Sequence, residues 1–219
     1  MVDNVEVIDD FIAQEDFDKI QQLLMGKNFP WYSNTGAAPA LWQDTGHQTI
    51  MVGKPGGLPD RPDLTHGEPD TYNFQFIHSF YVPWMDVGYQ SVYSDYFQIL
   101  FPILRKLPIR ALWRIKANMV PRQDQYVIHG HHVDITHYDE FQEAKGHLLG
   151  VDISPEEYMF ASKTAIFYVN NNNGHTVFSD GSKVDSVANR ITIFDAQQLH
   201  SGTSCTDMKC RVSINFNYF

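Results

Sequence analysis

The second half of the chain is a succession of short segments rich in β-branched and aromatic residues. Six such segments lie between residue 110 and the C-terminus: RALWRIKANMV, QYVIHGHHVD, TAIFYVN, HTVFSD, NRITIFD and CRVSINFNYF. Turn-forming stretches separate them, notably NNNG at 171–174 and SDGS at 179–182. Many short strands divided by such turns are typical of antiparallel sandwiches and jelly rolls. This pattern therefore favours an antiparallel β architecture.

The first half of the chain has a more helical pattern. Residues 6–26 predict a helix that is entered through Asp9 and Asp10 and ends near Gly26. Residues 86–106 predict a second helix, kinked or shortened at Pro102. Apolar residues of the first helix recur at helical spacing: Ala13, Phe17, Ile20 and Leu24. Between the two helices, 28–72 predicts long irregular structure and 74–82 predicts a strand.

Length and composition indicate one globular domain. The chain has 219 residues, of which 43% are apolar and 14% aromatic, and this is enough for a sizeable buried core. Helices followed by many strands indicate a sandwich or jelly roll with helices packed outside. We therefore expect a mainly β fold with flanking α-helices, in a single domain that covers 1–219.

Charge and cysteine content exclude several classes of protein. The formal net charge is -10, whereas binding to a nucleic-acid backbone needs a surplus of Lys and Arg, so nucleic acid is not expected as a partner. Two cysteines, Cys205 and Cys210, do not make a disulfide framework and are expected to be reduced. The N-terminus lacks the regions of a signal peptide, and no apolar stretch could span a bilayer. We expect a soluble cytoplasmic protein without a membrane association.

A histidine cluster at 129–139, HGHHVDITHYD, contains the first candidate metal ligands. On a strand, His132 and Asp134 would point to the same face, so that an imidazole nitrogen and a carboxylate oxygen can reach one ion. A third candidate is His200, which follows the predicted strand NRITIFD. Taken alone, the cluster also fits solvated imidazoles, and His200 fits an ordinary core or surface residue. Together, two His and one carboxylate form the facial triad that is diagnostic of non-haem Fe(II) oxygenases.

The last segment, 210–219, predicts a strand with one unusually polar face. Alternation places Arg211, Ser213, Asn215 and Asn217 on that face, and it places Val212, Ile214, Phe216 and Tyr218 on a core face. A guanidinium that faces inward needs an anion, because an unpaired buried charge is costly. No acidic residue occupies a matching position of this strand, which favours the carboxylate of a ligand as the partner.

The order of these motifs resembles the 2-oxoglutarate/Fe(II) dioxygenase superfamily. The motifs are His132-Val133-Asp134, then His200, then Arg211-x-Ser213 eleven residues later. The string TAIFYVNNNNGHT resembles the prolyl-4-hydroxylase-like branch, and the likeness covers about 110–219. The resemblance implies a double-stranded β-helix, the cupin-like form of the jelly roll. In this fold 109–219 would form the β-helix core, and 1–108 would supply helical support and substrate-side segments.

The resemblance also implies roles for individual residues. Fe(II) would be bound by His132, Asp134 and His200, which would be both the metal ligands and the catalytic site. Arg211 would pair with the C5 carboxylate of 2-oxoglutarate, assisted by Tyr168, and Ser213 would be a further contact. The Tyr that usually contacts the C1 side is not evident, and Asn118 is our substitute for it. These seven assignments are expectations that follow from the resemblance.

The implied reaction is the hydroxylation of a C–H bond with release of succinate and CO2. It would use Fe(II), 2-oxoglutarate and O2, with ascorbate as a supporting reductant. Halogenation is not expected, because related halogenases lack the metal carboxylate and Asp134 is present. The primary substrate, a peptidyl side chain or a small molecule, is not defined by the sequence.

Several alternatives stay open. His137-Tyr138-Asp139 is a competing His-x-Asp pair, but it precedes the helix-like EFQEAKGHLL, so we prefer the first pair. The same fold could be a non-catalytic metal-binding jelly-roll module, although Arg211 would then have no role. A zinc hydrolase with two His and one carboxylate is a further alternative, but this chain has neither HExxH nor an evident general base on a helix.

Other conspicuous residues receive simpler interpretations. Arg190 is expected in a surface ion pair and His175 in a loop. The four tryptophans are expected in the core or in interfaces: Trp31, Trp42, Trp84 and Trp113.

Overall fold

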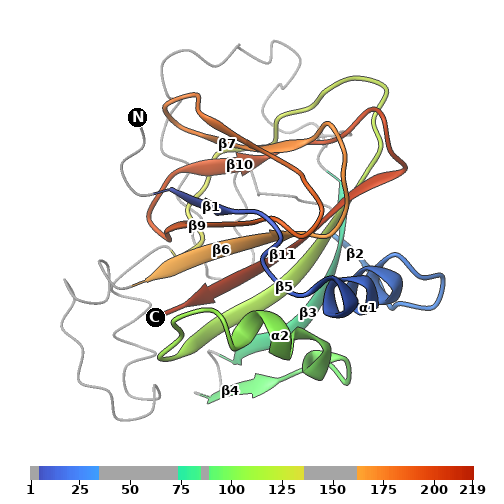
Figure 1. Cartoon of the computed structure of the whole chain (residues 1–219). Coiled ribbons are helices and arrows are strands. Elements are labelled where there is room, and N and C mark those ends of the chain that lie inside the picture. Colours follow the sequence, from blue (N-terminus) through green and yellow to red (C-terminus); the bar gives the residue numbers. More distant parts are fainter. Residues whose placement is uncertain (1–4, 35–73, 85–88, 136–161) are drawn as a thin grey trace.

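Two antiparallel sheets form the framework of the protein. The structure, a computed structural model, describes residues 5–34, 74–84, 89–135 and 162–219 (Figure 1). Within these residues the larger sheet has the order β1-β9-β6-β11-β5-β3-β2, with β4 paired to β3, and the smaller sheet has the order β10-β7-β8. The predicted mainly β fold with flanking helices is confirmed.

The strands are short and come from the whole length of the chain. The larger sheet contains β1 (Glu6–Ile8), β2 (Tyr32–Asn34), β3 (Gln75–Trp84), β4 (Tyr89–Val92), β5 (Leu112–Pro121), β6 (Lys163–Tyr168), β9 (Ile191–Asp195) and β11 (Cys210–Tyr218). The smaller sheet contains β7 (His175–Phe178), β8 (Lys183–Asp185) and β10 (His200–Gly202). The helical elements are α1 (Gln14–Leu24), the 3-10 helix η2 (Phe97–Leu100) and α2 (Phe101–Leu104).

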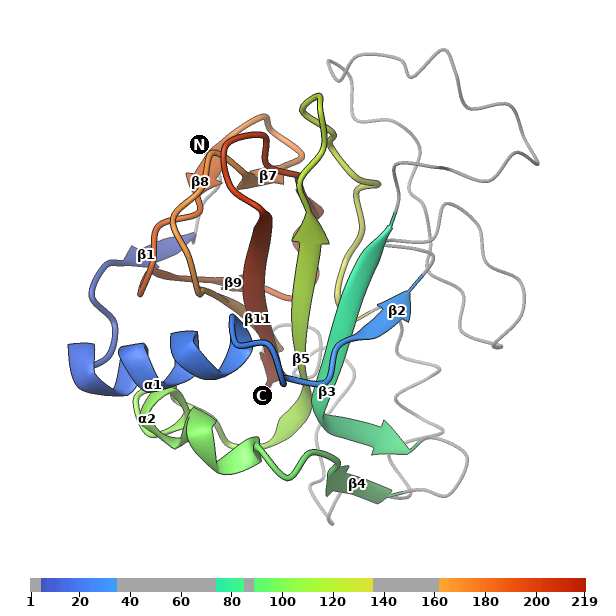
Figure 2. The ribbon, with the colours of Figure 1, turned by 90° about the vertical axis from the view of Figure 1, so that its right-hand side faces the viewer.

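The main core lies between the helices and one face of the larger sheet. Figure 2 shows α1 and α2 together on one side of that sheet. The core residues of α1 pack with the predicted core face of β11, which is Val212, Ile214, Phe216 and Tyr218. Burying each large apolar side chain contributes about 1.5–3 kcal/mol, so this layer supplies much of the stability. The other face of β11 is left for polar side chains.

The first predicted helix is too long at its N-terminal end. Residues 6–8 form β1, which pairs with β9, and α1 begins only at Gln14 after the N-cap Ala13. Asp10 has a φ of 49°, a left-handed conformation that a helix cannot include. Pairing with a strand far along the chain therefore overrides the local helical pattern.

The second predicted helix is also wrong over most of its described length. Residues 89–92 form β4, and α2 covers only Phe101–Leu104 after a 3-10 turn. Pro102 lies in the first turn of α2, where its missing N–H is not needed, so it starts this helix rather than breaking it. Residues 35–72 of the predicted irregular segment lie outside the described residues.

The two thiols are free, as predicted. Cys205 is buried and Cys210 is partly buried, and no disulfide joins them. Burial raises the pKa of both thiols, which favours their protonated form. Among the described helices, none combines the length and apolar character needed to cross a bilayer.

Candidate metal centre

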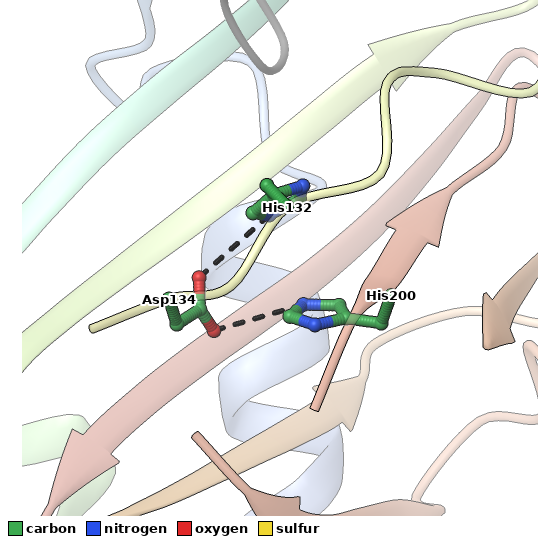
Figure 3. Close-up of side chains that lie close together, drawn as sticks. All are labelled: His132, Asp134 and His200. Atoms are coloured by element: carbon green, nitrogen blue, oxygen red, sulfur yellow. Dashed lines mark ion pairs between the residues drawn. The ribbon is translucent and has the colours of Figure 1, made fainter. Parts of the chain in front are cut away.

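Three side chains meet in the space between the two sheets. His132, Asp134 and His200 each offer a ligand atom, and these atoms lie within 4.8 Å of one another. The Nε2 atoms of His132 and His200 are each 3.7 Å from a different carboxylate oxygen of Asp134 (Figure 3). The structure thus brings together the three residues that the sequence singled out as metal ligands.

An isolated β-bridge between His132 and His200, rather than a regular strand, positions the two imidazoles. The predicted strand 125–134 is wrong, because this stretch pairs only at two isolated positions, Ile128 with Thr203 and His132 with His200. The His132 N–H donates to the His200 carbonyl at 2.9 Å, and the His200 N–H donates back at 3.0 Å. This reciprocal pair sets the two imidazoles beside each other, with ring centroids 4.6 Å apart.

Both imidazoles are oriented for binding a metal through Nε2. His132 Nδ1 lies 3.1 Å from the Gly130 carbonyl, and His200 Nδ1 lies 2.9 Å from the Gln198 carbonyl. A proton on each Nδ1 satisfies these contacts and leaves the Nε2 lone pair free. His200 Nε2 is buried and has no hydrogen-bond partner among the described residues. Burial, together with the nearby His200, lowers the pKa of His132 to about 4, so its ring is neutral at pH 7.

Asp134 is held in place by three donors. Its Oδ1 accepts from Arg114 Nη2 at 3.3 Å, and its Oδ2 accepts from Thr164 Oγ1 at 3.0 Å and Asn217 Nδ2 at 3.1 Å. Burial alone would raise the pKa of Asp134, but His200 and Arg114 outweigh it and hold the pKa well below its usual range. Two imidazoles and one carboxylate suit a divalent first-row metal, so the residues fit an Fe(II) site.

Two of these three donors were not predicted from the sequence. Asn217 was placed on the polar face of the last strand, but Arg114 and Thr164 were not noticed. The available signal was the alternation on β5, where Arg114 shares a face with Asn118, the residue that the analysis did select.

A cavity adjoins the three candidate ligands. Its wall includes polar side chains of β5 and β11, namely Lys116, Asn118, Arg211, Ser213 and Asn215. Asn118 and Ser213 are direct neighbours in the register of these strands. Asn118 Nδ2 also donates to Asn215 Oδ1 at 3.2 Å. The polar face predicted for the last strand therefore faces this cavity.

Arg211 is buried and faces the same cavity. Its Nε donates to Ser186 Oγ at 2.8 Å, and its Nη2 donates to Thr176 Oγ1 at 3.3 Å. Within the described part of the chain, no carboxylate forms an ion pair with it within 4.0 Å. A Cβ on Gly174 would come within 2.7 Å of Arg211 Cδ, so this glycine makes room for the side chain.

Tyr168 lies beside Arg211 rather than on the cavity wall. The guanidinium carbon is 5.6 Å from the centroid of the Tyr168 ring, close enough for a cation–π contact. The Tyr168 hydroxyl is 2.8 Å from Thr176 Oγ1, which Arg211 also contacts. Tyr168 thus supports Arg211 through its ring and through a shared threonine, and a direct contact with a ligand stays a prediction.

The remaining sequence predictions have mixed outcomes. Arg190 forms the expected surface ion pair, with Asp9. His175 is buried at the start of β7, so the prediction of a loop residue is wrong. Trp113 is buried and Trp31 packs against the core, as expected. His137, Asp139, Trp42 and the Trp84 side chain lie outside what the structure describes.

Comparison with known proteins supports the fold. No protein-family model and no curated protein matches the sequence. A prolyl hydroxylase from Trichoplax adhaerens, solved with a hypoxia inducible factor oxygen degradation domain peptide fragment, aligns over 100% of this chain and 84% of its own, with TM-score 0.52 and 11% identity. An oxidoreductase of the 2OG-Fe(II) oxygenase family from Burkholderia pseudomallei aligns over 97% of this chain and 84% of its own, with TM-score 0.50 and 8% identity. The chain therefore has the jelly-roll fold of the 2OG-Fe(II) oxygenases, as the sequence predicted.

Proposed function

We propose that this protein is an Fe(II)- and 2-oxoglutarate-dependent dioxygenase that hydroxylates a C–H bond and releases succinate and CO2. One observation carries the proposal. Two oriented imidazoles and a carboxylate share a cavity with a buried guanidinium that has no carboxylate partner among the described residues. The first set suits a metal with open coordination positions, and the guanidinium suits the free carboxylate of a dicarboxylate ligand.

Each residue of the site has a definite task in this proposal. His132, Asp134 and His200 bind Fe(II), which, when bound, supplies the activation of O2 that oxidises the substrate. Arg114, Thr164 and Asn217 keep the Asp134 carboxylate oriented and ionised. The carbonyls of Gly130 and Gln198 hold the Nδ1 protons, so that both Nε2 atoms stay available as ligands.

The far end of the cavity orients the co-substrate. Arg211 binds the C5 carboxylate, and Tyr168 and Thr176 fix the plane of its guanidinium. Ser213 and Asn118, side by side on the cavity wall, offer hydrogen bonds along the ligand between its two ends. Val120 and Ile166 also line this cavity and give it a small apolar part.

The main alternative is a metal-binding module without catalytic activity. Such a module needs no buried guanidinium beside the metal, and closed structural sites more often use four protein ligands. For the primary substrate we propose a peptidyl side chain or a small molecule rather than nucleic acid, because the net charge of -10 disfavours a phosphate backbone.

The direct test is turnover of 2-oxoglutarate by the purified protein without any primary substrate. With Fe(II), O2 and ascorbate, we expect stoichiometric succinate and CO2, and a chelator should abolish both products. Iron that binds tightly without any succinate being formed would favour the non-catalytic module. Hydrolysis of an ester or amide with Zn(II) and without 2-oxoglutarate would favour a hydrolase.

A further inference from the structure

A second cation faces the candidate site and has no acidic partner among the described residues, and neither the metal nor Arg211 accounts for it. Lys116 lies in β5 and lines the cavity. Its cross-strand neighbours are uncharged: Ser79 on β3 and Asn215 on β11. Within the described residues, no Asp or Glu oxygen lies within 4.0 Å of its ammonium group. A carboxylate whose charge acts on Lys116, that of Asp134, already accepts hydrogen bonds from Arg114, Thr164 and Asn217.

Lys116 is a cation at neutral pH despite its surroundings. Burial, and after it the charge of Arg114, lowers the pKa of Lys116 to about 8. That value still leaves the ammonium group protonated at pH 7. A partly buried charge without a counter-ion is unfavourable, so an anion bound in the cavity would relieve the cost of burying it.

The backbone positions of Lys116 and Arg211 lie far enough apart along the sheet for a short dicarboxylate to fit between them. Arg211 pairs with Val120 in the register of β11 and β5, and Val120 is four residues from Lys116. Four residues of an antiparallel strand cover roughly 13 Å. The carboxyl carbons of a five-carbon diacid are about 5 Å apart, from C–C bonds of about 1.5 Å. One charge-assisted hydrogen bond at each end extends the span between cations to roughly 12 Å.

The position of Lys116 also agrees with the place of the metal. Asp134 contacts Arg114 and Asn217, which are register partners on β5 and β11. This pair lies two residues along each strand from the pair of Lys116 and Asn215, on the side away from Arg211. Lys116 therefore lies on the metal side of the cavity, and Arg211 lies on the opposite side. A dicarboxylate whose one end is at Arg211 has its other end beside Lys116.

We infer that Lys116 and Arg211 form a two-cation clamp for 2-oxoglutarate, in which Lys116 binds the C1 carboxylate and sets the length of the diacid. This inference rests on the proposed function. Under this inference the C1 carboxylate contacts Lys116 and not Asn118, the residue expected there from the sequence. Asn118 lies between Lys116 and the Arg211 partner Val120 on β5. Lys116 is thus a residue that determines co-substrate specificity.

Glutarate is a suitable probe, because it has both carboxylates and cannot undergo the reaction. Titration of the Zn(II)-loaded full chain by calorimetry should show tighter binding of glutarate than of pentanoate, which lacks one carboxylate. Lys116→Met keeps an unbranched side chain that is one atom shorter and removes the charge, and it should weaken glutarate binding by about tenfold or more. Lys183→Met, on an exposed part of β8, removes the same charge and should leave the affinity within about twofold.

The outcomes separate this inference from the proposed function. If the parent protein turns over 2-oxoglutarate but Lys116→Met binds glutarate as well as the parent does, the clamp is wrong and the oxygenase proposal stands. If the parent neither binds glutarate nor turns over 2-oxoglutarate, both fail. Zn(II) affinity and melting temperature of Lys116→Met should match the parent, so that a loss of glutarate binding is not a loss of fold. In turnover, the variant should show a raised KM for 2-oxoglutarate.

Discussion

Each of the three candidate ligands is oriented by hydrogen bonds of its own, one at each imidazole Nδ1 and three at the Asp134 carboxylate. His132→Ala, Asp134→Ala and His200→Ala should each abolish Fe(II)-dependent turnover of 2-oxoglutarate, because two remaining ligands cannot hold the metal in a facial geometry. Each variant should also bind Ni(II) or Zn(II) at least about tenfold more weakly by calorimetry. The melting temperature of the metal-free proteins checks that the fold is retained.

His137→Ala and Asp139→Ala are the controls for this prediction, since they change the competing His-x-Asp pair. Both variants should keep metal affinity and turnover. Loss of turnover in these two variants, with full activity in the first three, would show that the wrong pair was chosen.

Substitutions of Arg211 test whether 2-oxoglutarate binds at the proposed position. Charge-assisted hydrogen bonds contribute roughly 1.5–3 kcal/mol each, so Arg211→Ala should raise the 2-oxoglutarate requirement by on the order of a hundredfold. Arg211→Lys should be intermediate, because an ammonium lacks the planar fork of a guanidinium. Tyr168→Phe should be milder than either. Titration of turnover with 2-oxoglutarate measures all three.

Arg190→Ala is a matched control for Arg211→Ala. Arg190 pairs with Asp9 at the surface, where Asp9 is 58% exposed, so its removal should not change the 2-oxoglutarate requirement. An Arg211→Ala protein that binds 2-oxoglutarate like the parent would remove the main argument for an oxygenase over a metal-binding module.

At the scale of elements, β11 serves the core with one face and the site with the other. Tyr218 is on the core face and is 1% exposed, yet its hydroxyl has no hydrogen-bond partner among the described residues. A buried hydroxyl without a partner is destabilising, so Tyr218→Phe should raise the free energy of unfolding by on the order of 1 kcal/mol. Tyr168→Phe should have the opposite sign, because the Tyr168 hydroxyl bonds Thr176. Urea denaturation of both variants compares them directly.

Tyr218 should also make the protein sensitive to alkaline pH. Burial, and then the charge of Glu6, raises the pKa of Tyr218 to about 12, against an ordinary value of about 10. A raised pKa gives stability that is fully present below pH 10 and is lost as the pH rises toward 12. The stability advantage of Tyr218→Phe over the parent should therefore grow between pH 10 and 12, and a constant difference would contradict the assignment.

The same strand explains why much of the site could be predicted from the sequence. Side chains alternate between the two faces of a strand, so an apolar set on one face of 210–219 determines which residues lie on the other. Arg211, Ser213 and Asn217 were therefore placed correctly on the polar face. The stretch 125–134 has no such constraint. It is fixed by a bridge to His200, sixty-eight positions away by residue number, and local periodicity contains no information about this contact. The candidate ligands were found because their chemistry is specific, although the predicted local structure was wrong.

The partners of Asp134 and the N-terminal strand β1 were not predictable for the same reason. Arg114 and Thr164 reach Asp134 from β5 and β6, which are distant in sequence. Residues 6–8 precede the helical spacing that begins at Ala13, and pairing with β9 makes them a strand. Sheet pairing between distant segments is decided by tertiary packing, which a periodicity within one segment does not report.

At the scale of the whole molecule, Asn189 attaches the N-terminal segment to the β framework. Its Oδ1 accepts from the Ile12 N–H at 3.1 Å, and its Nδ2 donates to the Ile12 carbonyl at 2.8 Å. The Asn189 carbonyl accepts from the Phe11 N–H at 2.9 Å, and the Asn189 N–H donates to the Tyr168 carbonyl at 3.1 Å. Its φ of 62° is left-handed, a conformation that asparagine tolerates better than most residues. One buried side chain thus joins the segment before α1 to the strand that supports Arg211.

Removal of this side chain should destabilise the whole domain while leaving the metal site intact. Asn189→Ala loses two buried hydrogen bonds of about 0.5–1.5 kcal/mol each and adds left-handed strain of roughly 1 kcal/mol, so a loss of about 2–4 kcal/mol is expected. Asn189→Gly avoids the strain and should lose about 1 kcal/mol less. The neighbouring ion pair between Arg190 and Asp9 gives the control. Arg190→Ala should lower the free energy of unfolding by less than about 1 kcal/mol. Urea denaturation measures the three losses, and calorimetry should find Zn(II) affinity unchanged below the transition, because α1 and the metal site lie on opposite faces of the larger sheet. Equal small losses in the alanine and glycine variants would mean that Asn189 does not hold the N-terminal segment in place.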